Sequence, residues 1–236
     1  MSGHSHAKTV KHKKEAADAK KSKVFSKISS EIALAAKSGN DLASNIRLRL
    51  AVDRAKASNM PSDSIERAIK KGTGELAGGQ LEDAMYEAYG PGGITLLIAA
   101  ITDNKNRTLG EIRQALSKNG GKFVDAGGVK WMFEQRAIVE VSSSKSKEEA
   151  ELAAIEAGAE DLSWVPDALE VSGRPEELEN LKGKLSLAGF AIESSSVDWV
   201  AKEPVTVSES DTAAAERLLE ALDDLEDIQE IYSNLA

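Results

Sequence analysis

The chain has 236 residues, of which 41% are hydrophobic and 29% charged, so it is expected to fold into two or three small domains rather than stay disordered. It contains no cysteine, which excludes disulfides, thiolate zinc sites and cysteine nucleophiles and favours a reducing compartment. The N-terminus is polar, and the longest apolar run, residues 94–101, is too short to span a bilayer. We therefore expect a cytoplasmic protein without membrane contact.

The net charge of −9 is unevenly distributed. Residues 1–72 contain twelve lysines and four arginines against seven acidic residues, a net charge of +9, and the remainder carries −18. Clustered cations neutralise phosphates and release counterions, so nucleic acid is the expected partner. The alternative is that the basic segment is an ordinary solvated surface, or that it docks on the acidic remainder of the chain.

The basic end is predicted to be helical. Residues 2–23 are rich in lysine and poor in large side chains, which indicates a mobile arm that passes into a helix from about Glu15. Apolar residues at helical spacing then predict three amphipathic helices, which end near Gly39, Asn59 and Gly72.

Glycines at positions 72, 74, 78 and 79 mark a domain boundary, after which the pattern changes to strands. Residues 85–89 and 94–102 predict two strands joined by a tight turn at residues 90–93, followed by a helix over 108–118 and a strand over 129–133. The turn lacks the Gly-Lys-Ser/Thr of a phosphate-binding P-loop, so a hairpin is the better interpretation.

A second run begins with a strand at residues 137–141. It continues with a helix at 147–157, strands at 162–165 and 168–171, a helix at 175–187 and a strand that ends near Val197. This βαββαβ order is typical of a ferredoxin-like sandwich. A strand at 205–207, a helix at 211–222 and a strand at 228–232 follow, and we expect them to return to the middle sheet.

The expected fold class is therefore α+β in three domains. Residues 1–76 form the basic helical domain with its arm, and residues 80–135 plus 203–236 form a middle α/β domain. Residues 136–202 form the ferredoxin-like domain, inserted in the middle one.

Several longer motifs carry a resemblance to a known family. They are Gly3-His4-Ser5, Lys11-His12-Lys13, Lys23-Val24-Phe25-Ser26-Lys27, Asn59-Met60-Pro61, Ile65-Glu66-Arg67-Ala68-Ile69, Tyr86-Glu87-Ala88-Tyr89-Gly90-Pro91-Gly92-Gly93, Asp103-Asn104-Lys105-Asn106-Arg107-Thr108 and Ile228-Gln229-Glu230-Ile231-Tyr232. Together they resemble the YebC/PmpR family over essentially the whole chain. The sequence departs from the family pattern at two places, with His6-Ala7 for Lys-Trp and residues 38–42 for Gly-Gly-x-Asp-Pro.

The resemblance implies a non-enzymatic cytoplasmic protein of three domains that needs no cofactor and no metal. It implies a DNA-binding transcriptional regulator, or alternatively a translational activator that contacts RNA or the ribosome. A Lys-rich arm offers point charges rather than the bidentate pairings that identify a base, which favours structured RNA or the ribosome on physical grounds. A monomer without a small-molecule substrate is expected.

The residues expected to contact nucleic acid lie in the arm, on the helices and in a second basic stretch at residues 103–122. They are Lys8, Lys11, Lys13, Lys14, Lys20, Lys21, Lys23, Lys27, Arg47, Arg54, Lys70, Lys71, Lys105 and Arg107. In the second stretch, Asn106, Arg107 and Thr108 either hold a phosphate at a helix start or Thr108 only caps that helix.

Two other functions have weaker support. Asp103, Glu111 and Asp125 are the carboxylates that a metal-dependent nuclease would need, but their spacing matches no ligand motif, and the histidines at 4, 6 and 12 all lie in the arm. The acidic residues that follow the last helix, from Asp223 to Asp227, are those of a surface helix or of a docking site for a basic protein.

Overall fold

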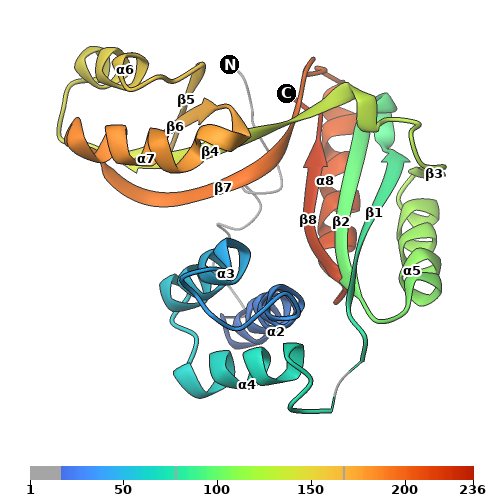
Figure 1. Ribbon diagram of the computed structural model, residues 1–236. Helices are drawn as coiled ribbons and strands as arrows, with labels where there is room; N and C mark the ends of the chain where they lie inside the picture. Colours follow the sequence, from blue (N-terminus) through green and yellow to red (C-terminus); the bar gives the residue numbers. More distant parts are fainter. Residues whose placement is uncertain (1–16, 78, 167) are drawn as a thin grey trace. The chain divides into compact units, whose positions relative to one another are not determined.

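The computed structural model describes the backbone of residues 17–77, 79–166 and 168–236, with side chains described from residue 22 onward (Figure 1). These residues form two compact units. The first contains residues 17–128 with Val207–Ile231, and the second contains Val129–Thr206 with Tyr232–Ala236. The predicted helix start at Glu15 lies outside the described residues.

Three helices open the first unit. They are α2 (Ala17–Ala36), α3 (Ile46–Ala57) and α4 (Ser62–Gly72). Ile32 of α2, Leu48 of α3 and Ile65 of α4 belong to one buried cluster, so each helix turns its apolar stripe towards the other two. The three predicted amphipathic helices are confirmed.

The first sheet contains β1 (Glu82–Tyr89), β2 (Thr95–Thr102), β3 (Lys122–Val124) and β8 (Ile228–Ser233), in the order β3-β1-β2-β8. Helices α5 (Lys105–Lys118) and α8 (Glu209–Asp223) belong to the same unit. β1 and β2 pair antiparallel with Tyr89 opposite Thr95, so residues 90–93 make a hairpin connection as predicted. Gly92 and Gly93 adopt φ values of 69° and 79° there, a backbone conformation that favours glycine.

The second sheet contains β4 (Phe133–Ser142), β5 (Asp161–Val165), β6 (Ala168–Gly173) and β7 (Ala191–Ala201), in the order β5-β6-β4-β7. Helices α6 (Lys147–Glu156) and α7 (Leu178–Leu187) bury side chains in the same core as this sheet. Strand order and connections are those of a ferredoxin-like sandwich. Since β8 joins the first sheet after this segment, the ferredoxin-like domain is inserted in the middle one.

The α+β fold class is thus confirmed, while the three domain boundaries remain a prediction. Two local expectations are wrong. Residues 130–132 form a 3₁₀ helix, and β4 runs unbroken from Phe133 to Ser142, because the chain turns to bury Val129 and Phe133 while Trp131 stays exposed. The predicted strand at 205–207 is only a single bridge from Val205 to Leu235. The short strand β3 was not predicted.

Two helical glycines make a matched pair for stability measurements. A Cβ at Gly72 would overlap the Ala33 carbonyl oxygen and lie 2.8 Å from the Ala36 Cβ, whereas a Cβ at Gly110 in α5 would meet nothing within 4 Å. We expect Gly72→Ala to lower the free energy of unfolding by about 1–3 kcal/mol through overpacking. We expect Gly110→Ala to raise it by about 0.5–1 kcal/mol through helix propensity. Urea unfolding measures both, and equal effects would contradict the close α2–α4 contact.

Candidate nucleic-acid interface

The predicted nucleic-acid contacts fall into three groups in the structure. Lys8, Lys11, Lys13 and Lys14 lie outside the described residues, and the side chains of Lys20 and Lys21 lie outside them too. Six others make ion pairs within the chain. The last two, Lys70 and Lys71, are exposed on α4.

The lysines of α2 contact the acidic end of α8. Lys23 Nζ lies 2.8 Å from Asp224 Oδ1, and Lys27 Nζ lies 2.7 Å from Asp223 Oδ1. Lys27 also donates a hydrogen bond to the Asp223 carbonyl oxygen over 3.1 Å, at the C-terminus of α8, where the helix dipole attracts a cation. These two lysines therefore bind the chain's own acidic helix.

Two of the three arginines of α3 make similar pairs. Arg47 binds both carboxylate oxygens of Asp83, over 2.8 and 2.7 Å. Arg54 lies 2.5 Å from Glu230 on β8 and 3.6 Å from Glu31 on α2. Burial raises the pKa of Glu31, and the charge of Arg54 opposes that rise. Arg54 thus favours the charged form of the Glu31 carboxylate, against the effect of burial.

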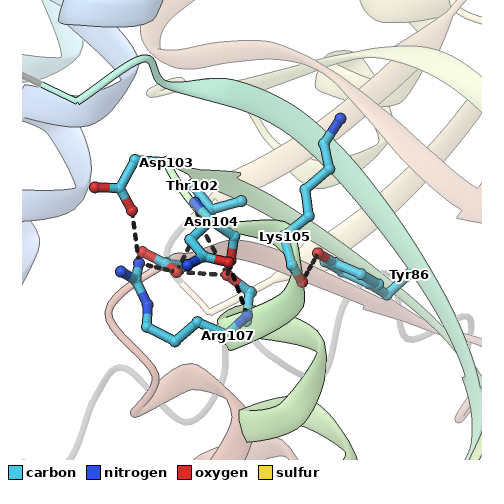
Figure 2. A network of polar contacts seen from close by, with 8 residues as sticks. Tyr86, Thr102, Asp103, Asn104, Lys105 and Arg107 are labelled. Carbon is cyan, nitrogen blue, oxygen red and sulfur yellow. Dashed lines mark hydrogen bonds and ion pairs between the residues drawn. The ribbon is translucent and has the colours of Figure 1, made fainter.

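The second basic stretch begins α5 (Figure 2). The Asn104 side chain accepts a hydrogen bond from the Arg107 backbone N–H over 3.1 Å and caps the helix, which starts at Lys105 rather than at 108. The prediction that Thr108 caps this helix is therefore wrong, because Thr108 lies buried within the first turn. Tyr86 donates a hydrogen bond to the Lys105 carbonyl oxygen over 3.2 Å.

One carboxylate oxygen organises the side chains around this helix start. Asp227 Oδ2 accepts hydrogen bonds from Thr108 Oγ1 over 2.6 Å, from Arg107 Nη2 over 2.7 Å and from Thr102 Oγ1 over 2.9 Å. Arg107 also lies 3.0 Å from Asp103, and a dashed line in Figure 2 marks this ion pair. The anion beside the first turn of α5 is thus the chain's own Asp227, which binds the side chains of Arg107 and Thr108.

The pKa of Asp227 reflects this environment. Burial acts to raise the pKa, but the hydrogen bonds from Thr108, Arg107 and Thr102 outweigh burial and hold the pKa below its ordinary value. Lys105 is also paired, with its Nζ 2.6 Å from Glu82. Neither member of the predicted pair Lys105 and Arg107 is therefore an isolated cation.

The exposed cations of helix α4 differ from the paired cations of α2, α3 and α5. Ile65 and Ala68 are buried, and Arg67, Lys70 and Lys71 lie exposed on the remaining surface. In the part of the chain that the structure describes, no ion pair involves these three side chains, nor Arg49 and Lys56 on α3. Residues 67, 70 and 71 lie on one face of the helix, because residues three and four positions apart are neighbours there. This spacing is visible in the sequence and groups Arg67 with the two lysines.

The described residues contain neither a cluster of possible metal ligands nor a helix that could span a membrane. No group of three or more acidic or histidine side chains there is close enough to hold a metal ion, and Asp103 instead pairs with Arg107. The described helices include none with the length and apolar character needed to cross a bilayer.

We expect Asp227→Asn to lower the free energy of unfolding at pH 7 by about 1–3 kcal/mol, because it removes a charge-assisted hydrogen bond from a largely buried group. The folded-state pKa of Asp227 is depressed, so its contribution is present above the unfolded pKa of about 3.9 and is lost as the pH falls through the folded value. Urea unfolding at pH 7 and below pH 4 should show the two proteins converging in acid.

Asp103→Asn is the matched control, because Asp103 also pairs with Arg107 but is 44% exposed. An exposed pair contributes about 0–1 kcal/mol, so this variant should unfold nearly as the parent does. If both variants lower the free energy of unfolding equally, the hydrogen bonds of Asp227 contribute no more than an exposed ion pair.

Two family models and several relatives match this chain over nearly its whole length. A model described as the TACO1/YebC protein N-terminal domain matches residues 5–75, and one described as the TACO1/YebC second and third domain matches residues 81–235. A relative from Thermotoga maritima, named "Probable transcriptional regulatory protein", is 46% identical over 99% of this chain and 93% of its own. One of the same description from Desulforapulum autotrophicum is 44% identical over 99% and 96%.

A solved structure is similar as well. The crystal structure of the conserved hypothetical protein Aq1575 from Aquifex aeolicus is 40% identical, with a TM-score of 0.87 over 96% of this chain and 95% of that one. The predicted resemblance is confirmed by both domain models and by full-length relatives. This chain belongs to the TACO1/YebC family, as do relatives that carry the name "Probable transcriptional regulatory protein".

Proposed function

We propose that this protein is a non-enzymatic, cytoplasmic regulator of gene expression that binds nucleic acid through its basic helical domain. The observation that carries the proposal is the set of exposed cations on α4, Arg67, Lys70 and Lys71, which have no ion-pair partner among the described residues. Phosphates bind such cations without first displacing a carboxylate. The lysines of the arm, Lys8 to Lys14, add to the same charge.

The position of these cations on α4 supports a phosphate contact. Asp63 lies in the first turn of the helix, and Lys70 and Lys71 lie in the last, so negative and positive charge are separated along the axis. A polyanion is attracted to Lys70 and Lys71 at the C-terminal end of α4. By contrast, Arg47 and Arg54 would have to release Asp83 and Glu230 before they could bind a phosphate.

The relatives' names favour DNA as the polymer, and hence a DNA-binding transcriptional regulator. The alternative is a translation factor that binds RNA or the ribosome. Lysines dominate the arm and the end of α4, and a lysine ammonium is a point charge that does not identify a base. This chemistry suits recognition of backbone shape, which structured RNA offers.

Docking on a basic protein is a second candidate function, supported by helix α6. This helix buries the small Ala150 and Ala154 against the sheet and exposes Leu152 by 63% and Ile155 by 57%. Exposed aliphatic side chains beside Glu148 and Glu151 suit a basic, amphipathic partner. Co-purification of a protein partner that survives nuclease treatment and is lost in Leu152→Glu would favour this function.

Charge reversal on α4 tests the main proposal. We expect Lys70→Glu with Lys71→Glu to weaken binding of a labelled duplex or structured RNA. The slope of log affinity against log salt should fall by about 2, one for each lost phosphate contact. Fluorescence anisotropy between low and physiological salt measures both quantities.

The control is Lys145→Glu with Lys184→Glu, which makes the same change of net charge on exposed residues of the ferredoxin-like unit. This variant should keep the parental slope. If the two double variants lose affinity equally, α4 is not the contact, and only the overall charge matters.

Crosslinking the protein to nucleic acid in cells and sequencing the attached fragments distinguishes the polymers. Promoter DNA is expected for a transcriptional regulator, and ribosomal or messenger RNA for a translation factor. Recovery of neither polymer above the level of the Lys70→Glu, Lys71→Glu variant would contradict both forms of the proposal.

A further inference from the structure

An aromatic and basic cluster lies at one end of the second sheet, where β4 begins and β7 ends. It consists of Lys130, Trp131, Trp199 and Lys202, all within the unit formed by Val129–Thr206. Trp131 is 66% exposed, compared with 42% for Trp164 and 39% for Tyr89.

The tryptophan is displayed by a fixed turn. Residues 130–132 form a 3₁₀ helix, and Lys202 holds it by two contacts from the end of β7. The Lys202 backbone N–H donates to the Met132 carbonyl oxygen over 2.9 Å, and its Nζ donates to the Trp131 carbonyl oxygen over 2.9 Å. The indole is thus carried on an anchored backbone, which lowers the entropic cost of binding a ligand.

Positive charge gathers beside the indole although the unit as a whole is acidic. Lys130 Nζ lies 4.9 Å from the centroid of the Trp199 ring, in a cation–π contact. Of the nearby carboxylates, Glu134 pairs with Arg136 over 2.6 Å, Asp198 accepts a hydrogen bond from Ser196 Oγ over 2.7 Å, and Glu203 follows Lys202 directly. Two lysines, Lys130 and Lys202, therefore lie at the turn that carries the indole.

We propose that Trp131 is a stacking platform for an unpaired base of a single-stranded nucleic acid, with Lys130 and Lys202 near the adjoining phosphates. An exposed aromatic ring flanked by cations is the arrangement with which proteins bind single strands, because every base has a face that stacks. The inference rests on the proposed nucleic-acid-binding function and adds a second contact, separate from α4 and located on the other unit.

A contact made by base stacking should depend on salt concentration differently from a contact made with phosphates. Loss of the ring removes the stacked base whatever the salt concentration, whereas loss of α4 cations acts through counterion release. A base paired within a duplex is not available to stack on the Trp131 ring, so we expect duplexes to bind without contacting this ring.

The experiment follows the fluorescence of Trp131 in the full-length chain with Trp164→Phe and Trp199→Phe, which leaves one tryptophan. An unstructured oligouridylate, its deoxy counterpart and a duplex are each titrated while anisotropy of the labelled oligonucleotide reports binding. We expect both single strands to quench Trp131 and the duplex to bind without quenching. In the otherwise unchanged chain, Trp131→Ala should weaken single-strand binding by about 5- to 100-fold, and Trp131→Phe by much less.

The matched control is Trp164→Ala, since Trp164 is also exposed but belongs to the far edge strand β5, with its ring near Lys147 and its Nε1 bonded to Glu151. It should leave single-strand affinity unchanged. Anisotropy binding without quenching, and with no loss in Trp131→Ala, would overturn the stacking site and leave the proposed function standing. Absence of binding to all three probes would overturn both.

Discussion

The Asp227 carboxylate joins three segments that are distant in the sequence. Its Oδ2 accepts hydrogen bonds from the end of β2 and from the first turn of α5, and its backbone carbonyl oxygen accepts one from Ile101 over 2.9 Å. Asp227 directly precedes β8, which the chain reaches only after the inserted ferredoxin-like domain. One partly buried, charged group thus links the start of β8 to the end of β2 and to the first turn of α5.

The ion pairs within the chain change how its uneven charge distribution is interpreted. The basic helices and the acidic body are partly each other's counterions, as the pairs of Lys27 with Asp223 and of Arg54 with Glu230 show. Half-exposed pairs of this kind contribute about 0–1 kcal/mol each, so a polyanion competes with them at small cost. The acidic side chains also repel nucleic acid that arrives in any other orientation. The same carboxylates therefore hold the helices and restrict which cations are available.

Local periodicity predicted most of the fold but little of the site. The stripes of α2 to α4 and the βαββαβ order are repeated local signals, which one sequence displays directly. The pairing of Thr102 with Asp227 joins residues 125 positions apart, and no spacing encodes it. Asn104 and Thr108 are both good capping residues, and the distant partner of Thr108, Asp227, decides between them. The apolar residues around Trp131 predict a strand, whereas the chain forms a 3₁₀ turn there.

The two proposed contacts depend on different physics and lie on different units of one chain. Cations on α4 act through counterion release, which weakens as salt rises, whereas a base stacked on Trp131 depends on contact between two flat surfaces and is nearly independent of salt. If one strand engages both proposed contacts, their linkage in one chain raises the effective concentration of the second contact. The proposal then implies tighter binding of polymers that offer a phosphate backbone together with an unpaired base. That combination is found in loops of structured RNA and in locally opened DNA, and it gives selectivity for the state of a nucleic acid without reading its sequence.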